Sequence, residues 1–216
     1  MLRIAIDGPG GAGKSTIAKM VAKELSLDYI DTGAMYRAAA LKMTRVGVPS
    51  QDEEGVAAAL ADTVIDFSEG NILLDGVVVN EEIRTPEMGN LASDYSALAC
   101  VRTKLGERQK EMGRTKSCIM DGRDIGTNVL PDAEVKIYLT ATAQERANRR
   151  YKELLEKGED VTYEQILKDI EERDYNDSHR ALNPLTKAED AVEVDSTYMT
   201  IWEVVARILA LVAKIR

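Results

Sequence analysis

The chain has 216 residues, a formal net charge of −9 and 44% hydrophobic residues. This length is sufficient for one α/β domain with insertions and a substantial buried core. The acidic balance argues against nonspecific binding to nucleic acid or to anionic membranes, because both need a broadly basic surface. Any site for an anionic ligand must therefore gather its positive charges locally.

Cys100 and Cys118 are the two cysteines of the sequence, and both lie in apolar surroundings. Two thiols provide neither a disulfide framework nor a zinc site, so we expect reduced cysteines in a cytoplasmic protein. The first apolar run begins at Leu2, and we therefore expect no signal peptide. No apolar run is long enough to cross a bilayer, and we expect no membrane partner.

The first predicted elements enclose a phosphate-binding loop. An apolar run, predicted to be a strand, ends at Asp7, and a helical pattern begins at Ile17. Between them the sequence matches G-x-x-x-x-G-K-[ST] in the strand–loop–helix context that this motif requires. The loop and its helix start comprise Gly8, Pro9, Gly10, Gly11, Ala12, Gly13, Lys14, Ser15 and Thr16.

Each part of this loop has a physical reason. Glycine adopts backbone conformations that other residues avoid, and without a side chain it lets phosphate oxygens approach several backbone N–H groups. The following helix presents its unpaired N-terminal amides to the same anion. Lys14 would reach the β- and γ-phosphates, and the Ser15 hydroxyl would bind Mg²⁺. The sequence therefore predicts a site for a nucleoside triphosphate such as ATP.

A short strand over 27–30 and a helix over 34–46 come next. Ser50 and Glu53 have the spacing of a capping box, which predicts a small Ala-rich helix. We expect that helix to end near Ala61.

Residues 63–80 differ in character from the rest of the chain. Their apolar side chains alternate, and Asp75-Gly76 between two β-branched runs is a strong hairpin signal. We expect a small antiparallel sheet there, inserted into a parallel α/β pattern. Its expected role is to brace the surrounding domain. Helical segments return over about 86–113.

The second half of the chain continues the alternation of strands and helices. Further strands are predicted over 117–120, 134–139 and 191–194. Capping patterns predict three helices, which begin at Thr142 with Glu145, Thr162 with Gln165, and Thr200 with Glu203. The first two are expected to end near Lys157 and Asp174. Trp202 and Tyr138 are expected in the core.

This alternation indicates an α/β fold with a five-stranded parallel sheet and helices on both faces. In such sheets the ligand binds outside the carboxyl ends of the strands. Polar segments follow four of the predicted strands, at Asp7-Gly8, Asp31-Thr32, Asp121–Asp124 and Asp195-Ser196. We therefore expect these segments to converge on one site.

Arginines are concentrated near that expected site. Phosphoryl transfer between two anions needs charge neutralisation and alignment, which planar guanidinium groups provide. Arg123 stands between two aspartates at a strand end, where we expect a role in the site. A predicted helix carries glutamates that alternate with Arg146, Arg149 and Arg150. The sequence leaves two interpretations of these arginines open: they contact ATP, or they form a solvated helix face.

Seven segments carry a resemblance to a known family: the phosphate-binding loop, Asp31–Arg37, Glu82–Thr85, Asp121–Thr127, Glu172–Asp174, Asn183–Leu185 and Asp195–Thr197. Together they resemble the bacterial cytidylate (CMP) kinases, which are P-loop nucleoside monophosphate kinases. Asp121-Gly122-Arg123-Asp124 is the most specific of these motifs, and the resemblance covers essentially the whole chain. It implies transfer of the γ-phosphoryl group from ATP to CMP or dCMP, with Mg²⁺, by a monomer.

The resemblance also implies a domain division. It places an ATP-binding core at 1–36, 114–156 and 181–216, and a nucleoside monophosphate-binding domain at 37–113 that contains the insert near 63–80. It further implies a short helical lid over 157–180, which would be mobile.

The resemblance implies roles for individual side chains. Four would be catalytic: Lys14, Arg123, Arg173 and Arg180. Eight would bind CMP: Thr32, Arg37, Ser93, Arg102, Arg123, Asp124, Asp177 and Arg180. Many members of the family have serine in place of Thr32, and the hydroxyl group is kept. Ser15 would bind Mg²⁺ directly, and Asp121 would do so through water.

Among the CMP-binding residues, Arg37 and Arg123 would bind the acceptor phosphate and Asp177 the ribose. Ser93, Arg102 and Asp124 would recognise cytosine, whose amino donor and neighbouring acceptors suit a carboxylate paired with a guanidinium. Uracil reverses two of those groups, which would leave buried polar groups unpaired.

Two alternatives remain open on the sequence. A kinase of the same architecture could use UMP or shikimate, although Asp124 and Arg102 argue against UMP, and a shikimate site would not explain the insert. A nucleotide-binding switch would hydrolyse nucleotide slowly without an acceptor. It should retain a guanine-binding or partner-binding signature, which the sequence lacks.

Overall fold

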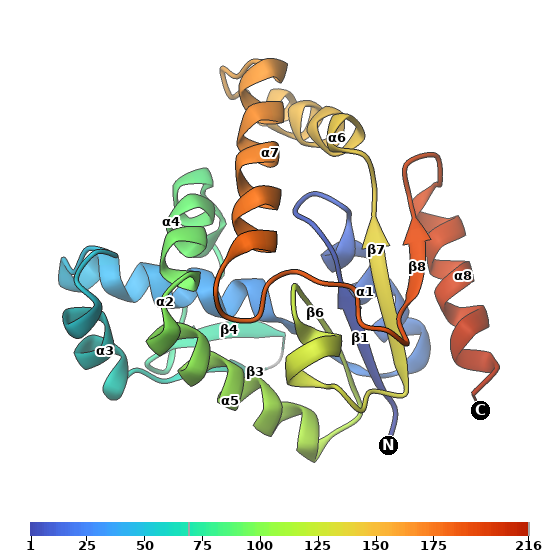
Figure 1. The fold of residues 1–216 in the computed structure, drawn as a ribbon, viewed down its shortest axis with the longest axis horizontal. Coiled ribbons are helices and arrows are strands. Elements are labelled where there is room, and N and C mark those ends of the chain that lie inside the picture. Colours follow the sequence, from blue (N-terminus) through green and yellow to red (C-terminus); the bar gives the residue numbers. More distant parts are fainter. Residues whose placement is uncertain (69, 216) are drawn as a thin grey trace. The chain divides into compact units, whose positions relative to one another are not determined.

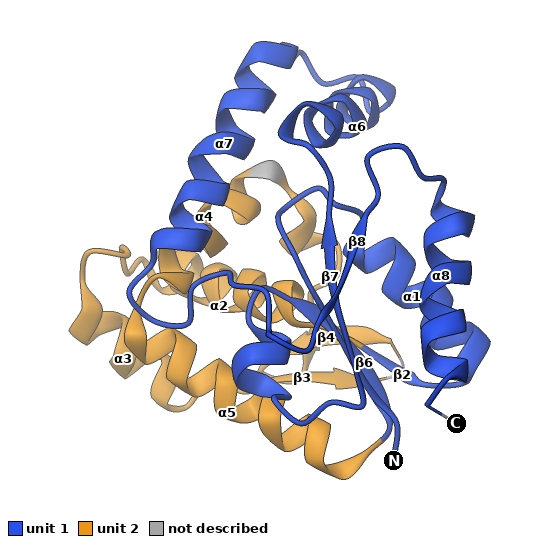
Figure 2. Ribbon diagram, turned by 45° about the vertical axis from the view of Figure 1, so that its right-hand side comes forward, with its two compact units in different colours: residues 1–29, 117–216 blue, residues 30–116 orange. Residues whose placement is uncertain are grey.

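The computed structural model describes residues 1–68 and 70–215. It forms two compact units, residues 1–29 with 117–216 and residues 30–116, which are coloured separately in Figure 2. Figure 1 labels most of the helices and strands of both units. Glu69, within the predicted insert, lies outside the described residues.

The five-stranded sheet has the strand order β2-β6-β1-β7-β8. Its strands are β1 (Arg3–Asp7), β2 (Asp28–Asp31), β6 (Cys118–Gly122), β7 (Val135–Thr140) and β8 (Val192–Asp195). β1 pairs in parallel with both β6 and β7, and β7 pairs in parallel with β8. Buried apolar runs such as Ile4–Ile6 are typical of strands covered on both faces. The predicted parallel sheet is confirmed.

Four longer helices belong to the first unit: α1 (Lys14–Leu25), α6 (Ala143–Glu156), α7 (Tyr163–His179) and α8 (Ile201–Ala213). α8 begins with the predicted capping box of Thr200 and Glu203. Its apolar stripe, which includes Val204 and Ile208, shares the core with Ile17 and Val21 of α1. α6 and α7 pack against each other through a separate small apolar cluster (Figure 1). Among the described residues, no helix is both long and apolar enough to cross a membrane.

The second unit surrounds α2 (Thr32–Val46), which packs against the helices and strands around it. Its other elements are α3 (Glu53–Ala61), β3 (Ile65–Ser68), β4 (Asn71–Leu74), β5 (Val77–Val78), the short 3₁₀ helix η1 (Glu82–Arg84), α4 (Pro86–Ser96) and α5 (Ala99–Thr115). The strands form an antiparallel sheet in the order β3-β4-β5. The predicted hairpin is confirmed: Asp75 and Gly76 have φ of 51° and 80°, as a tight two-residue turn requires.

Several helix ends differ from the prediction. Asp52, rather than Ser50, caps α3, because its carboxylate accepts a hydrogen bond from Gly55 N at 2.9 Å. Thr142 caps α6 as predicted, but the Glu145 carboxylate accepts from Arg149 Nε at 2.9 Å rather than completing a capping box. α7 continues beyond its predicted end near Asp174 to His179.

The expectation that Trp202 lies in the core is wrong, because 72% of this residue is exposed. The buried positions of α8 are Val204, Val205, Ile208 and Val212, and Trp202 falls outside that stripe. Tyr138 on β7 is only partly buried. Aromatic character alone therefore did not locate the core.

Candidate active site

The phosphate-binding loop connects the end of β1 to the start of α1. Gly8, Gly11 and Gly13 have φ of 148°, 77° and 89°, a range that favours glycine. Gly8 also has no room for a side chain, since a Cβ there would lie 1.9 Å from the Leu139 carbonyl oxygen. The loop therefore passes directly over the backbone of β7.

Lys14 is the first residue of α1 and is buried at the loop. Its Nζ donates hydrogen bonds to the carbonyl oxygens of Gly8 and Pro9, each at 2.8 Å. Burial and the nearby Arg123 charge lower the pKa of Lys14 below its usual value. The ammonium group thus stabilises the loop and lies where the motif requires a cation for phosphate.

Ser15 and Asp121 meet beside the loop although they lie far apart in the sequence. Ser15 Oγ donates to Asp121 Oδ2 at 2.9 Å, and the Tyr29 hydroxyl donates to Oδ1 at 2.7 Å. A hydroxyl and a carboxylate are hard oxygen ligands that suit Mg²⁺, which usually keeps several waters and binds substrate phosphates. Across residues 1–68 and 70–215, no group of three His, Cys, Asp or Glu side chains could hold a metal by itself. The Ser15 hydroxyl and the Asp121 carboxylate, beside a phosphate-binding loop, fit an ion that also takes phosphate oxygens as ligands.

Asp7 connects the end of β1 to the segment that carries Arg123 and Asp124. Its carboxylate accepts hydrogen bonds from Ile125 N at 2.8 Å and Gly126 N at 2.7 Å. These amides open a π-helical turn over Ile125–Val129. Burial raises the pKa of Asp7 to about 6, although both amides act to lower it. The sequence placed Asp7 at the site but did not anticipate this bridging role.

The raised pKa of Asp7 predicts a pH dependence of stability. The folded protein keeps the Asp7 carboxyl group protonated up to about pH 6, whereas the ordinary pKa of an aspartate side chain is 3.8. The associated stability is therefore fully present below pH 3.8 and is lost as pH rises through 6. We expect the free energy of unfolding of the wild type, relative to Asp7→Asn, to fall by about 3 kcal/mol across this window. Urea unfolding at several pH values measures it, and a constant difference would contradict the assignment.

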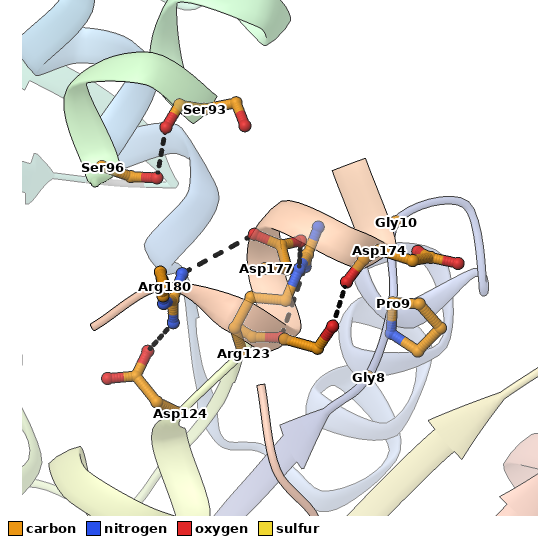
Figure 3. Close-up of polar contacts among 12 residues, drawn as sticks. Gly8, Pro9, Gly10, Ser93, Ser96, Arg123, Asp124, Asp174, Asp177 and Arg180 are labelled. Atoms are coloured by element: carbon orange, nitrogen blue, oxygen red, sulfur yellow. Dashed lines mark hydrogen bonds and ion pairs between the residues drawn. The ribbon is translucent and has the colours of Figure 1, made fainter. Parts of the chain in front are cut away.

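Four of the expected site residues form one network in the first unit: Arg123, Asp124, Asp177 and Arg180 (Figure 3). Arg123 Nε donates to Asp177 Oδ2 at 2.7 Å. Arg180 lies between two carboxylates, with Nη1 3.6 Å from Asp177 Oδ1 and Nη2 3.3 Å from Asp124 Oδ1. Burial alone would raise the pKa of Asp177, but the charges of Arg123, Arg173 and Arg180 hold it below its usual value.

This network can bind anions, because guanidinium groups exchange carboxylate oxygens for phosphate oxygens with similar geometry. It also adjoins the phosphate-binding loop, since a Cβ on Gly10 would lie 3.4 Å from Arg123 Nη2. His179, at the end of α7, is exposed and stacks on Tyr175, as expected of a histidine without a catalytic role.

The three arginines of α6 differ in their surroundings. Arg150 pairs with Glu153 at 2.9 Å on the helix surface. Arg149 pairs with Glu145 and also donates to the Ser196 carbonyl oxygen at 2.7 Å. Arg146 is buried, so the hypothesis of a solvated helix face is wrong for this residue.

In the second unit, Arg37 on α2 lies near the start of its own helix. Asp31 caps that helix by accepting from Ala34 N at 2.8 Å, and its other oxygen lies 3.5 Å from Arg37 Nη2. Thr32 is buried beside them. These contacts hold an arginine and a hydroxyl close together at the carboxyl end of β2.

Arg102 and Ser93, expected to contact cytosine, both lie next to Ser96. Arg102 Nη1 donates to the Ser96 carbonyl oxygen at 3.4 Å. Ser96 Oγ in turn donates to the Ser93 carbonyl oxygen at 2.8 Å (Figure 3). The Arg102 guanidinium is buried over Tyr36, with Cζ 5.5 Å from the ring centroid. Sequence reasoning missed Tyr36, although it lies within the segment 31–37 that carried the resemblance.

The sheet, the loop at the end of β1 and the arginine network define an α/β protein of the P-loop kinase class. Comparison with solved structures gives the same fold. The shikimate kinase of Bacteroides thetaiotaomicron superposes with a TM-score of 0.52 over 98% of each chain, at 13% identity.

Sequence comparison then gives the family. The family model described as cytidylate kinase matches residues 4–214. The cytidylate kinase of Clostridioides difficile (strain 630) is 50% identical over 209 residues, which cover 97% of each chain. That of Desulforamulus reducens is 53% identical over 214 residues, covering 98% of this chain and 96% of its own. The chain belongs to the cytidylate kinase family, and the resemblance drawn from the motifs is confirmed.

Proposed function

We propose that this enzyme transfers the γ-phosphoryl group of ATP to CMP or dCMP and releases ADP with CDP or dCDP. The reaction is inferred from membership of the cytidylate kinase family. The observation in the structure that supports it best is the network of Arg123, Asp177, Arg180 and Asp124 beside the phosphate-binding loop. A second anion placed in that network would lie close to the phosphates on the loop.

On the ATP side, the backbone N–H groups of the loop at residues 8–13, where Pro9 has none, bind the phosphates, and Lys14 contacts the β- and γ-phosphates. Ser15 and Asp121 are the residues that would hold Mg²⁺, Ser15 directly and Asp121 through water. When bound, Mg²⁺ neutralises negative charge on the β- and γ-phosphate oxygens. Positioning and charge stabilisation supply most of the catalysis in such a reaction.

On the acceptor side, Arg37 and Arg123 hold the phosphate of CMP, and Thr32 lines its pocket. Arg173 and Arg180 stabilise the transferring phosphoryl group as the lid over 157–180 closes. No general base is required, because the acceptor phosphate is already an anion at neutral pH. Asp177 contacts the ribose.

Cytosine is recognised by Ser93, Arg102 and Asp124. Asn128 Nδ2 donates to Asp124 Oδ2 at 3.1 Å, and this contact orients the carboxylate. Asp124 can then accept from the cytosine amino group, while Arg102 donates to a ring acceptor. Uracil has an acceptor in place of that amino group, so the Asp124 carboxylate would face another acceptor instead of a donor.

Replacing Asp124 by Ala should therefore reduce the preference for CMP over UMP. We expect the ratio of the two kcat/KM values to fall by about a hundredfold, mainly through loss of CMP turnover. Asp132→Ala is the matched control, because that side chain is 73% exposed and pairs with Arg3. An unchanged ratio in Asp124→Ala would exclude Asp124 from base recognition.

We also propose that the enzyme is a cytoplasmic monomer with a core of residues 1–36, 114–156 and 181–216 and an acceptor domain of residues 37–113. Cys100 and Cys118 are free thiols, which suits a reducing compartment.

The proposed function is tested by ADP release from Mg-ATP with CMP, dCMP, UMP, AMP, GMP, shikimate or no acceptor. We expect fast turnover with CMP and dCMP only. Fast turnover with UMP or shikimate would agree with the kinase class but would refute the proposal that the acceptor site recognises cytosine. Slow hydrolysis that is indifferent to every acceptor would indicate a nucleotide-binding switch.

A further inference from the structure

Arg146 connects the phosphate-binding loop to the end of β7. It lies on α6 and is only 4% exposed. Its Nε donates to the Ala141 carbonyl oxygen at 2.9 Å, and its Nη1 donates to the Gly10 carbonyl oxygen at 3.0 Å. A Cβ on Gly11 would lie 3.3 Å from Arg146 Cβ. The side chain therefore lies directly against the loop.

Asp174 on α7 holds the other side of the same guanidinium. Arg146 Nη1 donates to Asp174 Oδ1 at 2.9 Å, and Nη2 donates to Oδ2 at 2.5 Å. A two-point contact of this kind fixes the plane of the guanidinium as well as its position. Arg146 Nη1 donates to both the Asp174 carboxylate and the Gly10 carbonyl oxygen. The position of the carboxylate therefore determines the direction of the hydrogen bond from Nη1 to the loop.

We propose that Asp174 is a positioning residue that fixes the phosphate-binding loop through Arg146 and thereby couples ATP binding to the placement of α7. The inference rests on the proposed function, in which Arg173 and Asp177 of the same helix, and Arg180 directly after it, act on the acceptor and the transferring group. Asp174 itself contacts no substrate in this account.

The physical reason for this positioning role is the charge balance of the buried Arg146 guanidinium. Without the Asp174 carboxylate, the Arg146 guanidinium keeps its charge but loses its principal ionic partner. It must then turn toward other acceptors or toward water, and the donor to the Gly10 carbonyl oxygen shifts with it. A small displacement of the loop weakens several phosphate contacts at once.

The test compares wild type with Asp174→Asn, which keeps the side-chain shape and removes the charge. We expect the KM for ATP and the Kd of a non-hydrolysable ATP analogue to rise about tenfold, with the KM for CMP at saturating ATP within twofold of wild type. Arg146→Lys keeps the charge but cannot make the forked contact, and we expect the same ATP defect. The double variant should be no worse than either single variant, because both remove one interaction.

Glu153→Gln is the control, since it breaks the Arg150–Glu153 pair on the exposed side of the same helix. It should leave both KM values unchanged. The inference is overturned if Asp174→Asn keeps its affinity for ATP within twofold, or if it weakens ATP and CMP equally. A lower Tm with unchanged ATP affinity would also overturn it. Failure of wild type to phosphorylate CMP would instead refute the proposed function, because ATP-analogue binding is measured without an acceptor.

Discussion

Lys14→Met is expected to reduce kcat for phosphoryl transfer by about a hundredfold to a thousandfold. Lys14 is the buried cation of the phosphate-binding loop, and its Nζ donates to the Gly8 and Pro9 carbonyl oxygens at 2.8 Å. The variant loses the charge that stabilises the γ-phosphate during transfer, whereas Arg37 and Arg123 remain available to the acceptor phosphate. Initial rates of ADP release at saturating ATP and CMP measure the effect.

The matched control is Lys23→Met, because Lys23 is an exposed lysine in the last turn of the same helix. Its kcat should remain within twofold of wild type. The Lys14 variant also leaves two loop carbonyl oxygens without their donor, so we expect it to be less stable by about 1–3 kcal/mol. A folded Lys14→Met protein with wild-type kcat would show that the loop does not perform phosphoryl transfer.

Gly8→Ala is expected to destabilise the protein by at least about 3 kcal/mol and to abolish ATP binding. Two independent features require glycine at this position. Its φ of 148° lies where other residues are strained, and the added Cβ would meet the Leu139 carbonyl oxygen at 1.9 Å. Since that oxygen belongs to β7, which pairs with β1 in the sheet, the loop must move away from the sheet. Urea unfolding and titration with an ATP analogue measure both effects.

Gly89→Ala provides the contrast. Gly89 lies within α4 and has open space at the position of a Cβ. We expect this change to stabilise the protein by about 0.5–1 kcal/mol, because alanine is the better helix former. Equal stability losses in Gly8→Ala and Gly89→Ala would mean that the close approach of the loop to β7 is not what requires glycine.

Features encoded by residues close together in the chain were predictable from the sequence. The phosphate-binding loop has a fixed spacing and two flanking elements, and the Asp75-Gly76 turn has a conformation that few other residue pairs adopt. The capping box of α8 likewise depends on Thr200 and Glu203 alone. In each case the interacting groups lie within a few residues of one another.

Contacts between distant residues could not be predicted in the same way. Arg146 and Asp174 are 28 residues apart, and Arg123 and Asp177 are 54 apart. The predicted end of α7 near Asp174 falls short for the same reason, because Asp177 in its last turn is stabilised chiefly by the charge of the distant Arg123. Asp7 was located at the correct strand end, but the amides of Ile125 and Gly126 that it binds are known only from the structure.

The most direct measurement is the fate of the γ-phosphoryl group itself. ATP labelled on that group is mixed with the enzyme, Mg²⁺ and equal concentrations of CMP and UMP, and the labelled products are separated over time. We predict that the label enters CDP in step with ADP formation, with little in UDP or inorganic phosphate. Label that accumulates mainly in inorganic phosphate, or equally in CDP and UDP, would contradict the assignment of this chain as a CMP kinase.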